Sequence, residues 1–248
     1  MCQEDTEGEI KLEQTQEQRT EKDSMYELSA KNDRLRENSR RTRTMNFELI
    51  DNCFQIAALM CSALAAIAAA LRHKNRRFLI LALFYICVSM GTLYWVLYLF
   101  ILGSVPQVFY VSEFSWMAAY LFLLSFQMVR TDRISPFFSL TSLFCALFTA
   151  VVVLAFRIFG PSYFVSAAFA GVVSAIVYLA VWRLRHRGGG RLIDCWLLLC
   201  VGLQLILYIV SAFMQEFTHF NLYFAVDITL TFSFAALLPL ALREVTGK

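Results

Sequence analysis

The chain of 248 residues is 58% hydrophobic and 17% charged, whereas soluble proteins average about 45–50% apolar and about 25% charged residues. Residues 1–44 hold 9 of the 22 Lys and Arg and 11 of the 19 Asp and Glu, which leaves 13 basic and 8 acidic side chains for residues 45–248. This composition excludes a soluble globule. It also excludes a nucleic-acid-binding protein, because the remaining basic residues lie in short clusters between apolar runs.

Seven apolar stretches are long enough to form membrane-spanning helices, since a helix needs about 20 apolar residues to cross roughly 30 Å of hydrocarbon. Runs such as 63–71 and 197–203 do not alternate as the strands of a membrane barrel do. The sequence therefore predicts an all-α, polytopic integral membrane protein in the plasma membrane, with a seven-transmembrane-helix bundle over residues 45–248. The predicted helices cover residues 49–71, 78–102, 108–129, 136–156, 162–182, 192–213 and 220–242.

Basic residues between these stretches predict the orientation of the bundle. They cluster at 72–77, 130–133, 183–191 and 243–248, whereas the alternate loops contain only Arg157. Cytoplasmic loops are enriched in Lys and Arg, so we expect the C-terminus in the cytoplasm and the N-terminus outside. We then expect a cytoplasmic signalling partner to bind at the basic loops. The other expected partner is the lipid bilayer, which surrounds the helices.

Residues 1–44 have the polar composition of a disordered tail. They carry many basic residues on the side predicted to be outside, which long polar tails reach regardless of charge. A second hypothesis is that translation starts at Met45. The codons read as Arg40 and Arg41 would then be AGG-AGG, a bacterial ribosome-binding sequence just upstream of that start codon. The intact mass of the natively expressed protein distinguishes the two hypotheses.

Few ionisable side chains fall inside the apolar stretches. Three acids lie in the predicted outer half of the bilayer, each with polar residues at helical spacing on its own face, whereas Asp194 is expected at the cytoplasmic interface. Charged groups at membrane depth are costly and often functional. The pattern predicts an outward-facing polar pocket that serves as a ligand or proton site. Its candidate residues are Asp51, Glu113, Tyr120, Asp227, Tyr223, Thr231, Gln204 and Tyr208, with Arg157 as the candidate counter-charge.

Glu113 and Asp227 lie five and seven residues inside the predicted outer surface, which corresponds to depths of about 8 and 10 Å. We therefore expect the two carboxyl groups to approach each other, with Arg157, a ligand cation or a proton between them, because two unpaired carboxylates cannot both stay charged there. The alternative is that each acid faces a separate helix contact and bonds to a nearby Tyr or Ser. Small residues at helical spacing predict the contact face of the first helix. They are Ala58, Ser62, Ala65 and Ala69.

The residues that are missing exclude several activities. His73, His186 and His219 all lie in predicted loops, so we expect no metal site, no haem ligation and no Ser–His–Asp set inside the helices. No Lys lies between Lys74 and Lys248, which excludes a retinal Schiff base in the last helix. We expect neither an enzyme nor a cofactor.

Two functions remain open for the predicted pocket. The first is a sensor or receptor-like module that acts through a partner protein, since few residues follow the last helix. The second is a small transporter or channel for a cation or a small polar solute. A transporter needs polar groups through the whole thickness of the membrane, and the predicted inner half is poorer in them, so the sequence favours the sensor.

Overall fold

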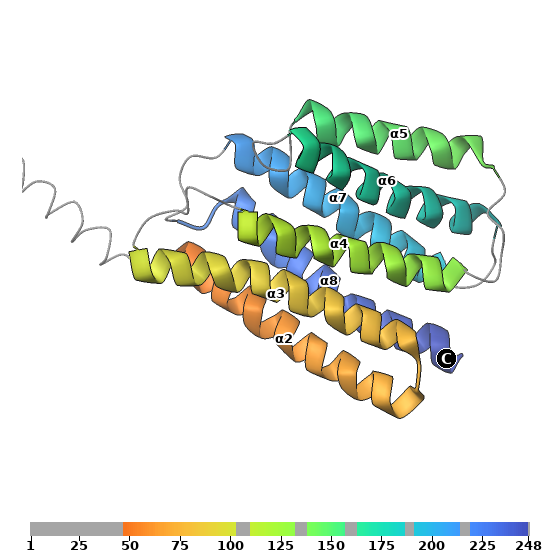
Figure 1. Ribbon diagram of the computed structural model, residues 1–248, viewed down its shortest axis with the longest axis horizontal. Coiled ribbons are helices and arrows are strands. Elements are labelled where there is room, and N and C mark those ends of the chain that lie inside the picture. The colour runs from red at the N-terminus through yellow and green to blue at the C-terminus, as the bar shows by residue number, and fades with distance from the viewer. Residues whose placement is uncertain are drawn as a thin grey trace, which may run out of the picture. The chain divides into compact units, whose positions relative to one another are not determined.

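The computed structural model describes residues 47–102, 110–131, 138–156, 163–186, 191–213 and 219–247. Within these ranges the fold consists of seven helices and no strands (Figure 1). Residues 1–44, the hypothetical start at Met45 and the candidate counter-charge Arg157 lie outside them. The helices are α2 (Phe47–His73), α3 (Arg76–Leu102), α4 (Tyr110–Thr131), α5 (Leu140–Ala155), α6 (Tyr163–His186), α7 (Arg191–Phe213) and α8 (Leu222–Thr246).

Each predicted apolar stretch forms a helix, and the prediction of an all-α bundle is confirmed. The largest changes are at helix ends, where α5 begins at 140 instead of 136, α6 ends at 186 instead of 182, and α8 ends at 246 instead of 242. Local hydrogen bonds set the limits of α8. The Asn221 side chain accepts from the backbone N–H of Phe224 at 3.3 Å, and Gly247, at φ 68°, donates its N–H to the Arg243 carbonyl.

Six helices pack in a closed ring, in the order α2, α3, α4, α6, α7 and α8, with α8 returning to α2. The remaining helix, α5, lies outside this ring against α6 (Figure 1). The core consists mainly of large apolar and aromatic side chains, among them Phe84, Tyr85, Phe126 and Phe169. Consecutive helices run in opposite directions, so α2 and α8 begin at one end of the ring and α4 and α6 end at the other (Figure 1).

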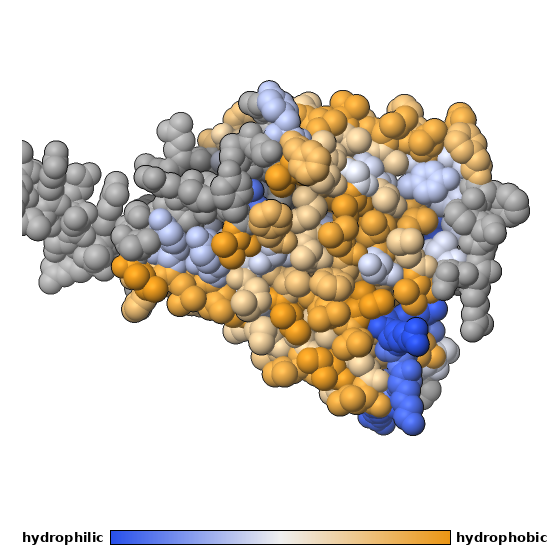
Figure 2. Space-filling model, in the orientation of Figure 1, coloured by the Kyte–Doolittle hydropathy of each residue, from blue (hydrophilic) through white to orange (hydrophobic). Residues whose placement is uncertain are grey.

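The outward faces of the helices are apolar, as an integral membrane protein requires. Figure 2 shows hydrophobic residues along the sides of the helices and hydrophilic ones gathered where α2 ends and α3 begins. Five helices, α2, α3, α6, α7 and α8, are long and apolar enough to cross a membrane. The other two helices, α4 and α5, do not meet this criterion, and the reason is different for each. The helix α4 carries Glu113, Gln127 and Arg130, and α5 has 16 residues, or about 24 Å at 1.5 Å per residue.

The predicted contact face of α2 is confirmed only at Ala69, because Ala58 and Ser62 are half-buried and Ala65 is exposed. The structure buries Leu59, Ala63, Ala66 and Ala69. The buried face continues from Asp51 and Gln55 at helical spacing. Because those two polar side chains turn inward to bond with neighbouring helices, they set the face that the rest of α2 presents to the ring.

Gly91 is required where α3 meets α4. A Cβ atom added there would lie 2.6 Å from Nε1 and 2.8 Å from Cδ1 of Trp116. We expect Gly91→Ala to lower the free energy of unfolding by about 1–3 kcal/mol through overpacking. The matched controls are Gly171→Ala and Gly202→Ala, whose added Cβ would meet no atom within 4 Å, so they should gain up to about 1 kcal/mol of helix propensity. Thermal unfolding in detergent measures all three, and equal stabilities for Gly91→Ala and the controls would contradict the prediction.

Candidate functional site

Gln55 lies at the centre of a buried group of hydrogen bonds that joins α2, α3 and α8. Its Nε2 donates to Oδ1 of Asp227 and to Oγ1 of Thr231, each at 3.3 Å, and its Oε1 accepts from the Thr92 hydroxyl at 2.6 Å. The carboxyl groups of Asp51 and Asp227 are hydrogen-bonded to each other. Asp51, Gln55, Thr92, Asp227 and Thr231 are all buried, and we call them the carboxyl cluster.

The contact between Asp51 and Asp227 defines what the cluster can bind. A hydrogen bond between two carboxyl groups requires a proton, which the protonated group donates to the other. Two ionised carboxylates in contact repel each other strongly in a medium of low dielectric constant. The pair therefore holds at least one proton or, when both groups are ionised, needs a cation in its place.

Two tyrosines extend the carboxyl cluster to further acids. Tyr223 on α8 interacts electrostatically with Asp51, Asp227 and Glu48. Tyr208 on α7 interacts with Asp227 and with Glu113, which is buried in the first turn of α4. The acids near this end of the bundle thus lie within electrostatic range of these two phenol groups.

The structure gives Asp227 a carboxyl partner different from the predicted one. Its neighbour is Asp51, not Glu113, because α8 packs beside α2 and α7, whereas α4 packs beside α3 and α6. For the Glu113 carboxyl group, no hydrogen bond or ion pair is found among the described residues. Glu113 and Asp227 lie at similar predicted depths, but their helices, α4 and α8, are not neighbours in the ring.

The remaining predicted residues form a second group between α4 and α7. The Tyr120 hydroxyl donates to Oε1 of Gln204 at 2.9 Å, and Gln204 also bonds to Tyr208. The Tyr120 ring packs edge-on against Phe169, with centroids 5.1 Å apart. Tyr208 therefore connects this pair to the carboxyl cluster. The predicted pocket is a closed cluster in the described structure, since Asp51, Glu113 and Asp227 are each at most 7% exposed.

Five charged residues from five helices form an ion-pair network at the opposite end of the bundle. Asp194 on α7 accepts from Nη1 of Arg130 on α4 at 2.8 Å, and its two oxygens accept from Nε of Arg183 on α6 at 3.2 and 3.1 Å. Glu244 on α8 accepts from Nη2 of Arg130 at 2.6 Å and from Nη1 of Arg77 on α3 at 3.4 Å. We call these five residues the ion-pair network.

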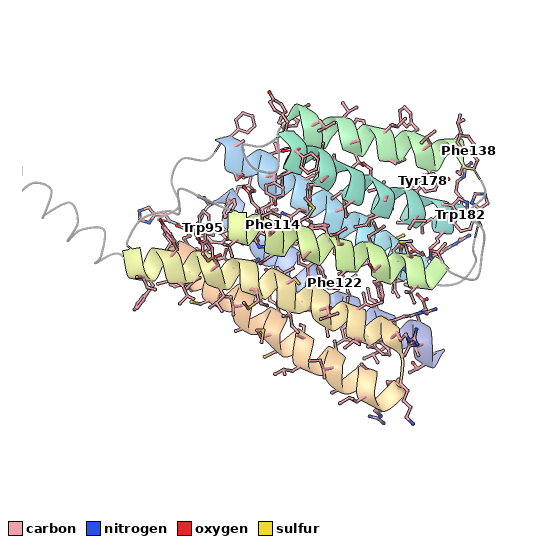
Figure 3. The ribbon with its side chains drawn as sticks, in the orientation of Figure 1. Trp95, Phe114, Phe122, Phe138, Tyr178 and Trp182 are labelled. Atoms are coloured by element: carbon pink, nitrogen blue, oxygen red, sulfur yellow. The ribbon has the colours of Figure 1, made fainter. Side chains whose placement is uncertain are left out.

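Gln127 adds a neutral hydrogen bond to Asp194. Its Nε2 donates to Oδ1 of Asp194 at 2.8 Å, and its Oε1 accepts from Nη1 of Arg130 at 2.5 Å. Figure 3 shows Trp182 on α6 toward one end of the bundle and Trp95 on α3 toward the other. Trp95 donates its indole N–H to Glu48 at 2.9 Å.

The sequence did not reveal this network, and the prediction that Arg130 and Arg183 lie in loops is wrong. Both are buried in helices, and Asp194, in the first turn of α7, is 1% exposed. The reason is that α4 and α6 continue past their apolar stretches and meet α7 there. The signal was the placement of Arg130 and Arg183 at helix ends on the same predicted side as Asp194, where opposite charges can pair.

Comparisons with protein-family models, curated proteins and solved structures found no match. The chemistry of the site therefore rests on its own side chains. Among the described residues, no group of three or more His, Cys, Asp or Glu is arranged to hold a metal ion. The two buried polar assemblies, one at each end of the ring, are the features that a function has to use.

Proposed function

We propose that this chain is a sensor or receptor-like module of the plasma membrane, with seven transmembrane helices and an external N-terminus. It registers a proton or a cation at the carboxyl cluster and acts through a cytoplasmic partner protein at its basic loops. The observation that supports this most is that a single helix, α8, contributes to both assemblies. Asp227 and Thr231 belong to the carboxyl cluster, and Glu244 belongs to the ion-pair network.

The two ends of α8 give the coupling a physical basis. Asp227 and Glu244 are 17 positions apart, or about 26 Å along a helix. Loss of the shared proton converts the Asp51–Asp227 contact from attraction to repulsion, which favours separation of α2 from α8. A displacement of α8 changes the geometry of the Arg130–Glu244 pair, which is 2.6 Å long. A change at either end of α8 therefore shifts the position of this one helix, and coupling between distant sites requires such a shared element.

A transporter or channel for a cation or small polar solute is the second candidate. The observation that favours it is that buried polar groups occur along the whole length of the bundle. Gln127, Arg130 and Asp194 supply the inner half of the bundle with polar groups, and Tyr120 and Gln204 lie between the two ends. These groups weaken the sequence argument against transport, which was that the predicted inner half is poorer in polar groups.

One experiment in proteoliposomes separates the two functions. Spin labels are placed on Met128→Cys and Arg243→Cys in a background without other cysteines, since both positions are exposed near the ion-pair network. We expect the distance between the labels to change between pH 8 and pH 5. The double variant Asp51→Asn/Asp227→Asn should show one distance at both pH values. Glu48→Gln and Glu113→Gln, which remove the neighbouring acids, should keep the response.

Vesicles loaded with the pH-sensitive dye pyranine report transport in the same preparation. A sensor should give no proton flux above that of protein-free vesicles. A flux that disappears in Asp51→Asn/Asp227→Asn would establish the transporter instead. Identical label distances at both pH values, and with sodium or potassium present, would overturn the sensor.

A further inference from the structure

Arg183 is the one arginine of the ion-pair network, within the described residues, whose guanidinium has a buried donor without an acceptor. Its Nε bonds to Asp194, and its Nη1 donates to the backbone carbonyl of Arg130 at 2.6 Å, but its Nη2 has no partner. The side chain is 1% exposed. A buried donor left without an acceptor costs about 1–3 kcal/mol, and more when it is charged, so this group points to an acceptor that the polypeptide does not supply.

The charges around Arg183 lead to the same conclusion. The network contains three cations, Arg77, Arg130 and Arg183, and two anions, Asp194 and Glu244. Arg130 bonds to both anions. The network therefore carries one excess positive charge, and Arg183 shares its carboxylate partner Asp194 with Arg130. The missing acceptor is an anion.

The neighbourhood of Arg183 favours a phosphate group as this anion. Trp182, the preceding residue, has a second buried N–H donor without a partner, and Figure 3 shows it at the same end of α6. Arg185 and His186 follow on the last turn of α6, both exposed, and α7 begins nearby at Arg191. A guanidinium fork matches the oxygens of a phosphate, and basic groups between helices at a membrane surface attract anionic lipid headgroups.

We propose that Arg183 binds a phosphate group at this end of the bundle, supplied by the headgroup of an anionic phospholipid. Nη2 of Arg183 donates to a phosphate oxygen, which neutralises the excess charge of the ion-pair network. The Arg183 side chain is 1% exposed, so binding requires its Nη2 to become accessible to the headgroup. The site is independent of the proposed sensor function, because it is defined by binding alone.

Native mass spectrometry of the full chain in detergent tests the proposal. The probes are phosphatidylglycerol, diacylglycerol with the same acyl chains but no phosphate, and inorganic phosphate. We expect retention of phosphatidylglycerol over diacylglycerol and a higher unfolding temperature with phosphatidylglycerol. If millimolar inorganic phosphate alone stabilises the chain, the ligand is a free phosphate. If only phosphatidylglycerol stabilises it, the site belongs to the lipid. No preference for phosphatidylglycerol and no effect of phosphate would overturn the proposal.

Variants assign the binding to Arg183. Arg183→Lys keeps the charge and loses the second donor group of the fork, so it should bind phosphatidylglycerol at least about tenfold more weakly while the chain still folds. Arg72→Gln is the matched control, because Arg72 is an exposed basic residue at the same end of the bundle, and its binding should equal that of the wild type. Equal losses in the two variants would show non-specific attraction by surface charge and would contradict the proposal.

Discussion

Asp194→Asn is expected to lower the free energy of unfolding by about 3–5 kcal/mol, which is the cost of leaving a buried charge without its partner. Among the described residues, Asp194 forms ion pairs with both Arg183 and Arg130, and Arg130 also pairs with Glu244. Asparagine has nearly the same shape, so packing changes little. The loss therefore measures the charge interaction, and titration from a mild detergent into sodium dodecyl sulfate gives the free energy.

Glu244→Gln is the matched comparison for that substitution. The Glu244 side chain is 19% exposed, so water replaces part of what the carboxylate supplies to Arg130 and Arg77. Exposed pairs contribute about 0–1 kcal/mol, and we expect a loss near the upper end of this range. A loss for Asp194→Asn no larger than that for Glu244→Gln would show that the buried pair does not hold α4, α6 and α7 together.

Gln55→Met should lower the free energy of unfolding by about 2–3 kcal/mol. Methionine is similar in size to glutamine but cannot replace the amide. The Thr92 hydroxyl loses its acceptor, and Asp227 and Thr231 lose a donor. Buried polar groups left without partners cost about 1–3 kcal/mol each, and the hydroxyls recover part of this by bonding to their own helix carbonyls, as Thr92 does with Val88 at 3.2 Å.

Thr231→Val is the control for the carboxyl cluster. It removes one acceptor of the Gln55 amide and leaves the bond to Asp227 in place. We expect a loss of at most about 1 kcal/mol, measured by the same detergent titration. If Thr231→Val were as destabilising as Gln55→Met, the amide of Gln55 would not be the group that joins α2, α3 and α8.

The positions of the helices could be predicted because hydrophobic length is a local property of the sequence. Stretches such as 49–71 and 192–213 are long enough to cross hydrocarbon, and the structure has helices over both. Helix ends were less predictable, because they depend on tertiary contacts. Arg183 continues α6 beyond its apolar stretch and pairs with Asp194 on another helix.

The composition of the site could be predicted, but its pairings could not. Helical spacing placed Asp51 and Gln55 on one face and Asp227 and Thr231 on another, and all four belong to the carboxyl cluster. The order of the helices around the ring decides which faces meet, and depth in the membrane carries no information about that order. This is why Asp227 bonds to Asp51 and not to the predicted partner, Glu113.

A double-mutant cycle between the two ends of α8 tests the central claim, that the carboxyl cluster and the ion-pair network are coupled. Asp227→Asn and Glu244→Gln are made singly and together, and the free energy of unfolding is measured for each. Sites more than 7–10 Å apart normally add within about 0.3–0.5 kcal/mol, and these two are about 26 Å apart along the helix. We expect an interaction free energy of at least about 1 kcal/mol. Additive effects within about 0.5 kcal/mol would contradict the coupling.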